Sequence, residues 1–235
     1  MATALSSIES QAREHLKETT ASFWSSAELI AIINKGIKDL WGAIIDLHQE
    51  HYITVDASNV SLAASTASLT GVPTDVFRVL LIEPRDTTTT PGRSIVFTPR
   101  DYNSPEFINA RSRTAVDPSG GLEIFYAITQ AGAPVGAPTI LIAPQISSAL
   151  NLRLVYVPVI ATKVAGDDNP IPGESDQALI NWCVAWARAK EREDRSPDPA
   201  WLAAYSTEKG AMLTRLTPRQ TQEPDVVGDL WGAWF

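Results

Sequence analysis

Histidines near the end of a predicted helix are the first side chains that could bind a metal ion. His48 and His51 flank Glu50, but they stand three residues apart, and the residue after His48 is glutamine. A zinc-peptidase helix needs histidines four residues apart with a glutamate directly after the first. The spacing instead suits imidazole side chains that contact the last carbonyls of a helix. We therefore predict no metal site here.

The other reactive side chains also lack a partner of the required type. Cys183 is the single cysteine and lies on an apolar helix face, so we expect a buried, inert thiol. Asp167 and Asp168 lie in a Gly/Pro-rich loop without the alternating oxygen ligands of a calcium loop. The repeated Gly-Ala-Pro of 132–138 has no following lysine to bind phosphate. We predict no catalytic residue, no metal and no cofactor, and hence no enzyme.

The charge and hydropathy of the chain argue against nucleic-acid or membrane binding. The 235 residues carry a net charge of −8, whereas sequence-independent binding to phosphates needs a basic surface. No apolar run approaches the length that crosses a bilayer. The first residues lack the basic and apolar regions of a signal peptide, so we expect synthesis in a cytosol and no membrane partner.

Apolar residues at three- and four-residue spacing predict helices near both ends of the chain. Ser25 and Glu28 form a capping box at the start of a helix that runs to about residue 48, and Gly36 within it predicts a close helix crossing. A helical hairpin is expected over 175–216, with Asp198 capping its second helix. The residues expected in a shared core are Leu29, Ile33, Ile37, Leu40, Trp41, Ile44, Leu179, Trp182, Cys183 and Trp186.

Between these helices the pattern changes to alternating and β-branched runs, which predict strands. We expect 76–83 and 94–98 to form a hairpin with the threonine-rich loop 86–92 at its tip. The predicted fold class is α+β: a helical bundle from the N- and C-terminal helices, with an inserted antiparallel β-rich block and an extended C-terminal tail. The expected divisions are 1–50, 51–165, 166–216 and 217–235.

The end of the first hairpin helix carries alternating charges. This pattern is typical of a solvated face, and it also suits an inter-subunit surface. The residues concerned are Arg188, Lys190, Glu191, Arg192, Glu193 and Arg195.

The last residues of the chain combine a polar, helix-breaking tether with an apolar end. Such an end either folds back onto its own domain or inserts into another subunit or protein, because exposed aromatic residues favour association. The residues expected to dock are Val226, Val227, Leu230, Trp231, Trp234 and Phe235.

Three segments together carry a resemblance to a known family. They are the run from Phe23 to Trp41, the order of Val157-Pro158 and then Asp176 to Ile180, and the helix with Tyr205 and Lys209 before the tail. In this order they resemble the head-to-tail adaptor (connector, or head-completion) proteins of tailed bacteriophages.

The resemblance implies a structural virion protein at the head–tail interface, made in the host cytoplasm. It implies a homo-oligomeric ring, typically a dodecamer, below the portal protein. The C-terminal tail would reach into the portal, the β loops would face the next tail or neck protein, and viral DNA would pass through the lumen without being read. Two alternatives remain open: another neck component, such as a tail terminator or stopper, and a cytosolic enzyme with an unrecognised site.

Overall fold

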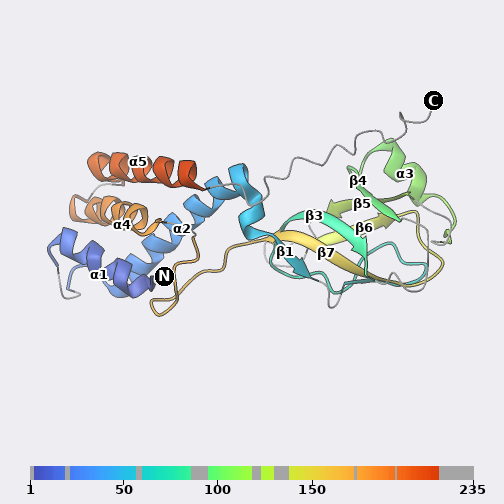
Figure 1. The fold of residues 1–235 in the computed structure, drawn as a ribbon, viewed down its shortest axis with the longest axis horizontal. Coiled ribbons are helices and arrows are strands. Elements are labelled where there is room, and N and C mark those ends of the chain that lie inside the picture. The colour runs from blue at the N-terminus through green and yellow to red at the C-terminus, as the bar shows by residue number, and fades with distance from the viewer. Residues whose placement is uncertain are drawn as a thin grey trace, which may run out of the picture. The chain divides into compact units, whose positions relative to one another are not determined.

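A computed structural model describes residues 3–18, 22–56, 60–85, 95–117, 123–129, 138–171, 174–193 and 195–216 (Figure 1). Across these residues the chain forms five α-helices, one 3₁₀ helix and seven strands. In chain order they are α1 (Leu5–Leu16), α2 (Ser26–His48), η1 (Gln49–Tyr52), β1 (Thr54–Asp56), β2 (Ser61–Leu62), β3 (Val76–Pro84), β4 (Val96–Pro99), α3 (Pro105–Arg111), β5 (Glu123–Thr129), β6 (Thr139–Ala143), β7 (Leu150–Pro158), α4 (Asp176–Glu191) and α5 (Pro199–Arg215).

The α+β class predicted from the sequence is confirmed. The chain divides into two compact units. The helical unit comprises Met1–His51 and Ala161–Phe235, and the β unit comprises Tyr52–Ile160. Strands therefore interrupt a set of helices that is assembled from both ends of the chain.

Helix α4 is the central element of the helical unit, because α1, α2 and α5 all pack against it (Figure 1). Its composition explains this position: four alanines and small or aliphatic residues let neighbouring helices approach closely, and nine of its residues are buried. A short bridge between Ala4 and Asp168 also fixes the start of α1 to the segment before α4.

The predicted close crossing at Gly36 is confirmed. A Cβ atom at Gly36 would lie 2.8 Å from Cδ1 of Trp182 and 3.1 Å from Cδ2 of Leu179. The indole N–H of Trp182 also donates a 3.0 Å hydrogen bond to the carbonyl of Ile32. Glycine is thus required in α2 because the Trp182 ring of α4 occupies the space of a side chain.

The predicted helix caps are confirmed as well. Ser25 accepts a hydrogen bond from the backbone N–H of Glu28, and the Glu28 carboxylate accepts one from the backbone N–H of Ser25. Asp198 accepts hydrogen bonds from the N–H groups of Ala200 and Trp201 at the start of α5. These local contacts fix where α2 and α5 begin.

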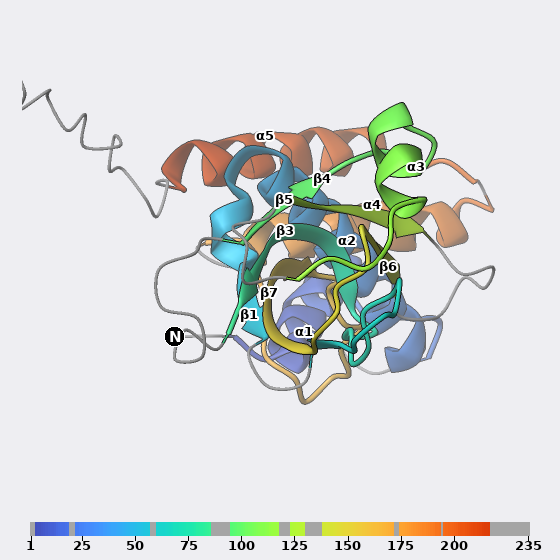
Figure 2. The same ribbon diagram turned by 90° about the vertical axis from the view of Figure 1, so that its right-hand side faces the viewer.

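The β unit contains two sheets among its described residues. In the first, the long strand β7 pairs with β1 and β2 along one edge and with β3 along the other. Strands β3 and β7 run side by side in both views (Figures 1 and 2). The second sheet has the order β4-β5-β6.

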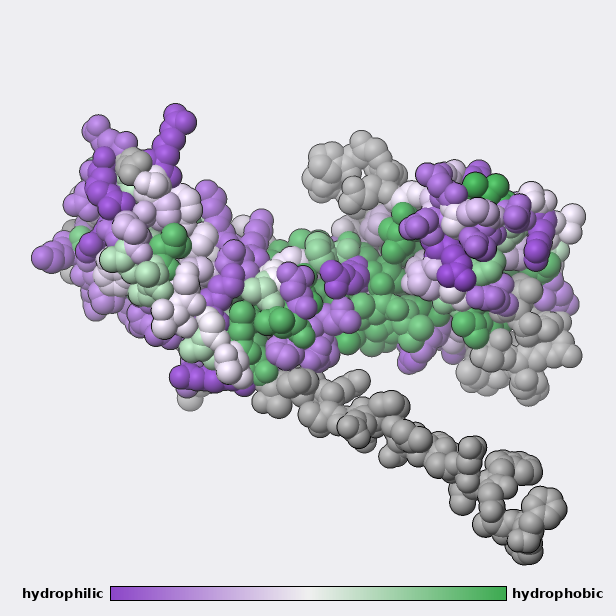
Figure 3. Space-filling model, turned by 90° about the horizontal axis from the view of Figure 1, so that it is seen from above, coloured by the Kyte–Doolittle hydropathy of each residue, from purple (hydrophilic) through white to green (hydrophobic). Residues whose placement is uncertain are grey.

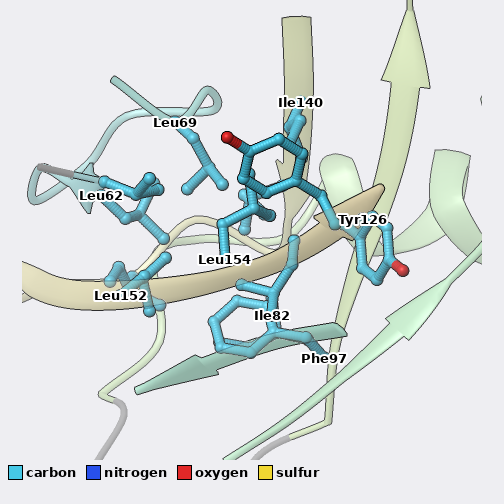
Figure 4. Packing of buried hydrophobic residues seen from close by; sticks show 13 residues of the cluster. Leu62, Leu69, Ile82, Phe97, Tyr126, Ile140, Leu152 and Leu154 are labelled. Atoms are coloured by element: carbon cyan, nitrogen blue, oxygen red, sulfur yellow. The ribbon is translucent and has the colours of Figure 1, made fainter. Parts of the chain in front are cut away.

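The core of the β unit lies between the two sheets (Figure 4). The first sheet contributes alternate residues of β7 to this core: Leu152, Leu154 and Tyr156. The second sheet contributes residues such as Tyr126 and Ile140 from the opposite side. The alternation of a strand sends the intervening residues to the outer faces. Helix α3 covers the outer face of the second sheet, where Phe107 and Ala110 pack against Ala127 and Ala143.

Two predictions about the strands are wrong. The β block is not wholly antiparallel, because β4 pairs with β5 in parallel. Strands β3 and β4 do not form a hairpin, because each pairs within a different sheet. The physical reason is that β3 and β4 belong to the two opposite layers of a sandwich. Ile82 of β3 and Phe97 of β4 enter the shared core from these two layers. The proposed hairpin tip, 86–92, lies outside the described residues.

Candidate interaction surfaces of the helical unit

The charged end of α4 is one candidate for contact with another subunit, but three of its cations bind within the helical unit. Lys190 donates to the Phe23 carbonyl at 3.0 Å and to the Glu28 carboxylate at 2.8 Å. The Lys190 ammonium also lies 5.0 Å from the centre of the Phe23 ring. The hydrogen bond from Lys190 and those from Ser25 hold the pKa of Glu28 at about 2. Lys190 therefore fixes the end of α4 to the start of α2.

Two of the three arginines of this end, Arg188 and Arg192, bind the start of α5. Arg192 donates to the Asp198 carboxylate at 3.3 Å, and Arg188 lies 4.0 Å from the same group. The Arg188 guanidinium also lies 5.5 Å from the centre of the Trp201 ring. These contacts orient α5 against α4. The remaining charges, Glu191, Glu193 and Arg195, are exposed.

A second polar cluster connects α5 to α2. The Asp39 carboxylate accepts hydrogen bonds from the Tyr205 hydroxyl and, at 2.6 Å, from the Lys209 ammonium. Burial opposes ionisation of Asp39, but the hydrogen bonds from Lys209 and Tyr205 outweigh it and hold the pKa of Asp39 below its ordinary value. Burial and the hydrogen bond to Asp39 raise the pKa of Tyr205. This cluster fixes the helix that leads into the C-terminal segment.

A third cluster, which the sequence reasoning missed, organises the link between α1 and α2. Arg13 donates to the Glu9 carboxylate at 2.9 Å and to the Trp24 carbonyl at 3.0 Å. Glu18 accepts from the hydroxyl and the N–H of Ser22, both at 2.6 Å. The hydrogen bond from the Ser22 hydroxyl, together with those from the backbone N–H groups of Phe23, Ser22 and Trp24, holds the pKa of Glu18 at about 2. The four-residue spacing of Glu9 and Arg13 on a helix is a signal that could have identified part of the cluster.

The residues predicted to form the core of the helical bundle lie on α2 and α4, the two helices that cross at Gly36. Trp182 and Trp186 are half-buried, with ring centres 5.7 Å apart, and Trp182 lies 4.9 Å from the Tyr205 ring. The others are 8% exposed or less, and they are Leu29, Ile33, Ile37, Leu40, Trp41, Ile44, Leu179 and Cys183.

Among the residues that the structure describes, the reactive side chains do not gather at a common site. Burial raises the pKa of the Cys183 thiol to about 12, so the thiolate form is disfavoured. Nδ1 of His48 lies 3.5 Å from the Glu50 carboxylate at the end of α2. Within the described part of the chain, no three His, Cys, Asp or Glu side chains gather in a way that could hold a metal ion.

The predicted docking residues of the tail lie outside the described residues, which end at Leu216. Their docking therefore remains a prediction from the sequence. None of the helices in the described part of the chain combines the length and the apolar character that a bilayer span requires.

Comparison with known proteins assigns the family. No curated protein matches the sequence. The model of the SU10 adaptor protein family matches residues 3–228, which includes both the helical and the β unit. This family consists of structural phage adaptors rather than enzymes, and it places the protein in the virion. The chain therefore belongs to the SU10 adaptor protein family and is a structural adaptor of a bacteriophage.

Proposed function

We propose that this adaptor forms a homo-oligomeric ring, a dodecamer, that joins the portal protein to the tail. Viral DNA passes through the lumen of the ring without being read. The observation that carries the proposal is the family match over residues 3–228, because it covers the helices that lead into the C-terminal segment. The net charge of −8 suits a lumen through which DNA passes without binding.

In this proposal the C-terminal segment is the part that docks in the portal. Helix α5 is held by Asp39 on one side and by the cations of α4 at its start. The contacts of α5 thus fix the position of the end of this helix. The 19 residues of the C-terminal segment, 217–235, follow from there. Three cations at the end of α4 bind their own helical unit, which argues against the α4 charges as the main inter-subunit surface.

The energetics of docking favour a ring over a single copy. Burial of Trp231, Trp234 and Phe235, at about 150–250 Å² each and about 25 cal/mol per Å², contributes roughly 11–19 kcal/mol. Ordering about ten tether residues costs on the order of 10–20 kcal/mol. The two quantities nearly cancel, so one tail binds weakly. A ring that docks all its tails at once raises the effective concentration of each tail after the first.

The test compares two triple variants within the same segment. Substitution of Trp231, Trp234 and Phe235 by alanine is expected to abolish attachment to purified portal-bearing capsids, measured by co-sedimentation. The matched control replaces the polar Thr221, Gln222 and Glu223 by alanine and should attach as the unchanged protein does. Attachment of the aromatic variant at the control level would refute portal docking by the tail.

Imaging of intact particles by electron microscopy tests the position of the ring. We expect density for this chain directly against the portal, with twelve copies. Density one layer lower would instead assign the protein to another neck component, such as a stopper. The aromatic variant then serves as a control, since it should leave this position empty.

A further inference from the structure

We propose that neighbouring copies contact each other through the two opposite outer faces of the β unit. The outer face of the β1-β7-β3 sheet of one copy would meet helix α3 of the next. This inference rests on the proposed ring and specifies which surfaces close it.

The first surface is a row of aliphatic side chains on the outer face of the first sheet, here named the sheet patch. Val55 of β1 stands opposite Val155 of β7, which stands opposite Leu81 of β3. Opposite residues of antiparallel strands project on the same face. Val55 is 52% exposed and Leu81 is 42% exposed. In Figure 3, hydrophobic residues in green gather over the part of the β unit where Figure 1 places β3.

A polar row bounds the sheet patch along the strands. Glu83 and Arg153 are the next opposite pair on the same face, and the Arg153 Nε donates to the Glu83 carboxylate at 2.8 Å. An aliphatic centre with an ion pair at its edge suits a protein–protein interface, in which charged residues are depleted from the core and the rim is polar.

The second surface lies on α3 and the turn before it, and is here named the α3 patch: Tyr102, Ile108 and Arg111. Ile108 is 54% exposed, although Phe107 beside it is buried against the second sheet. The Arg111 guanidinium donates to the Tyr102 hydroxyl at 2.7 Å and lies 5.6 Å from the centre of that ring. Tyrosine and arginine dominate the energetics of protein interfaces, and here each is held in place before any partner binds.

The two patches lie on opposite sides of the β unit. The core residues of both sheets point between the layers, whereas Val155 and the residues under α3 point outward. A ring of identical copies needs a heterologous interface, in which two different surfaces of each chain meet. Two different patches on opposite outer faces of one sandwich satisfy this requirement, whereas a single patch that meets its own copy gives a two-fold dimer.

The distribution of charge along the chain favours a second copy of this protein as the partner that binds the two patches. Residues 52–160 contain seven arginines, no lysine and eight carboxylates, a net charge of −1. The rest of the chain carries −7 of the total −8. Like charges oppose the approach of copies through their helical units far more than through their β units. Identical chains therefore come together with least repulsion at the β units.

A charge exchange across the proposed interface tests it. The single variants Leu81→Asp and Ile108→Lys each replace an aliphatic side chain of the contact with a charge, and we expect at least a tenfold loss of rings assembled on portal-bearing capsids. The double variant, Leu81→Asp with Ile108→Lys, sets opposite charges against each other at every contact, so it should recover most of the assembly. The like-charge double variant, Leu81→Lys with Ile108→Lys, should not recover.

The control is Val164→Lys, at a residue that is 65% exposed in the helical unit and should leave assembly unchanged. Circular dichroism of every variant confirms folding. A second route treats the double variant, Leu81→Cys with Ile108→Cys, with a bismaleimide cross-linker. Because Cys183 is buried, a ladder of cross-linked copies should appear only with both new cysteines. Normal rings from both single variants, or no ladder, would overturn this inference. Absence of rings from the unchanged protein would instead overturn the proposed function.

Discussion

Replacement of Gly36 by alanine tests the close crossing of α2 and α4. In an open helix this change is favourable by about 1 kcal/mol, because alanine restricts the unfolded backbone and glycine is a poor helix former. At Gly36 the new Cβ would lie 2.8 Å from Cδ1 and 3.0 Å from Cγ of Trp182. These atoms are near the root of a rigid ring, so the ring must move as a whole.

The structure gives the expected size of the effect. The ring is held by its hydrogen bond to the Ile32 carbonyl, so a shift of Trp182 weakens that bond as well as the packing. An extra methyl group in a well-packed core costs about 1–3 kcal/mol. We therefore expect Gly36→Ala to lower the free energy of unfolding of the helical unit, despite the gain in helix propensity.

Gly42 supplies a matched control in the same helix, because, apart from the adjoining α2 backbone, no atom of the described residues lies within 4 Å of a Cβ placed there. Gly42→Ala should raise the free energy of unfolding by about 0.5–1 kcal/mol. Urea unfolding followed by far-ultraviolet circular dichroism measures both variants. We expect them to differ by about 1–3 kcal/mol, with Gly36→Ala the less stable. Equal stabilisation by the two substitutions would refute the crossing.

Three further predictions concern single side chains of the helical unit. Asp39→Asn should lower the free energy of unfolding at neutral pH by about 0.5–1 kcal/mol, because the carboxylate is partly exposed and its ion pair is screened. The folded-state pKa of Asp39 is depressed, so this contribution is complete above the unfolded pKa of about 3.9 and is lost as the pH falls through the folded value. A pH series of urea titrations that shows no convergence of the two proteins in acid would contradict it. Ser25→Ala should cost about 1 kcal/mol in the same assay, and Ser25→Asp, which retains a cap, should cost less. Cys183 should react with a maleimide much more slowly in the folded protein than in urea, because its thiol is buried and its pKa is raised to about 12; equal rates would show that the site opens readily.

The sequence predicted those features that depend on local chemistry. The capping box of Ser25 and the cap of Asp198 follow from side chains that bind backbone N–H groups within three residues. The crossing at Gly36 was predictable because an uncompensated glycine in a strongly apolar helix needs a packing reason. The α+β class followed from the change in hydrophobic period along the chain.

Features that depend on distant partners could not be predicted in this way. The parallel pairing of β4 with β5 is decided by which strands close the sandwich, and the alternation within either strand is compatible with both directions. The contacts of Lys190 with Phe23 and Glu28 join residues more than 160 positions apart. An alternating charge pattern therefore indicated an exposed face, although three of its cations are engaged within the unit.

The β unit is attached to the helical unit through two neighbouring strands. The chain enters through β1 and leaves through β7, and Thr54 stands opposite Tyr156 in their antiparallel pairing. The Cα atoms of such opposite residues lie only about 4.5–5.5 Å apart. Any domain that begins and ends in two paired strands presents the same pair of attachment points. Another domain that begins and ends in two paired strands could therefore replace the β unit without a change in the path of the chain through the helices.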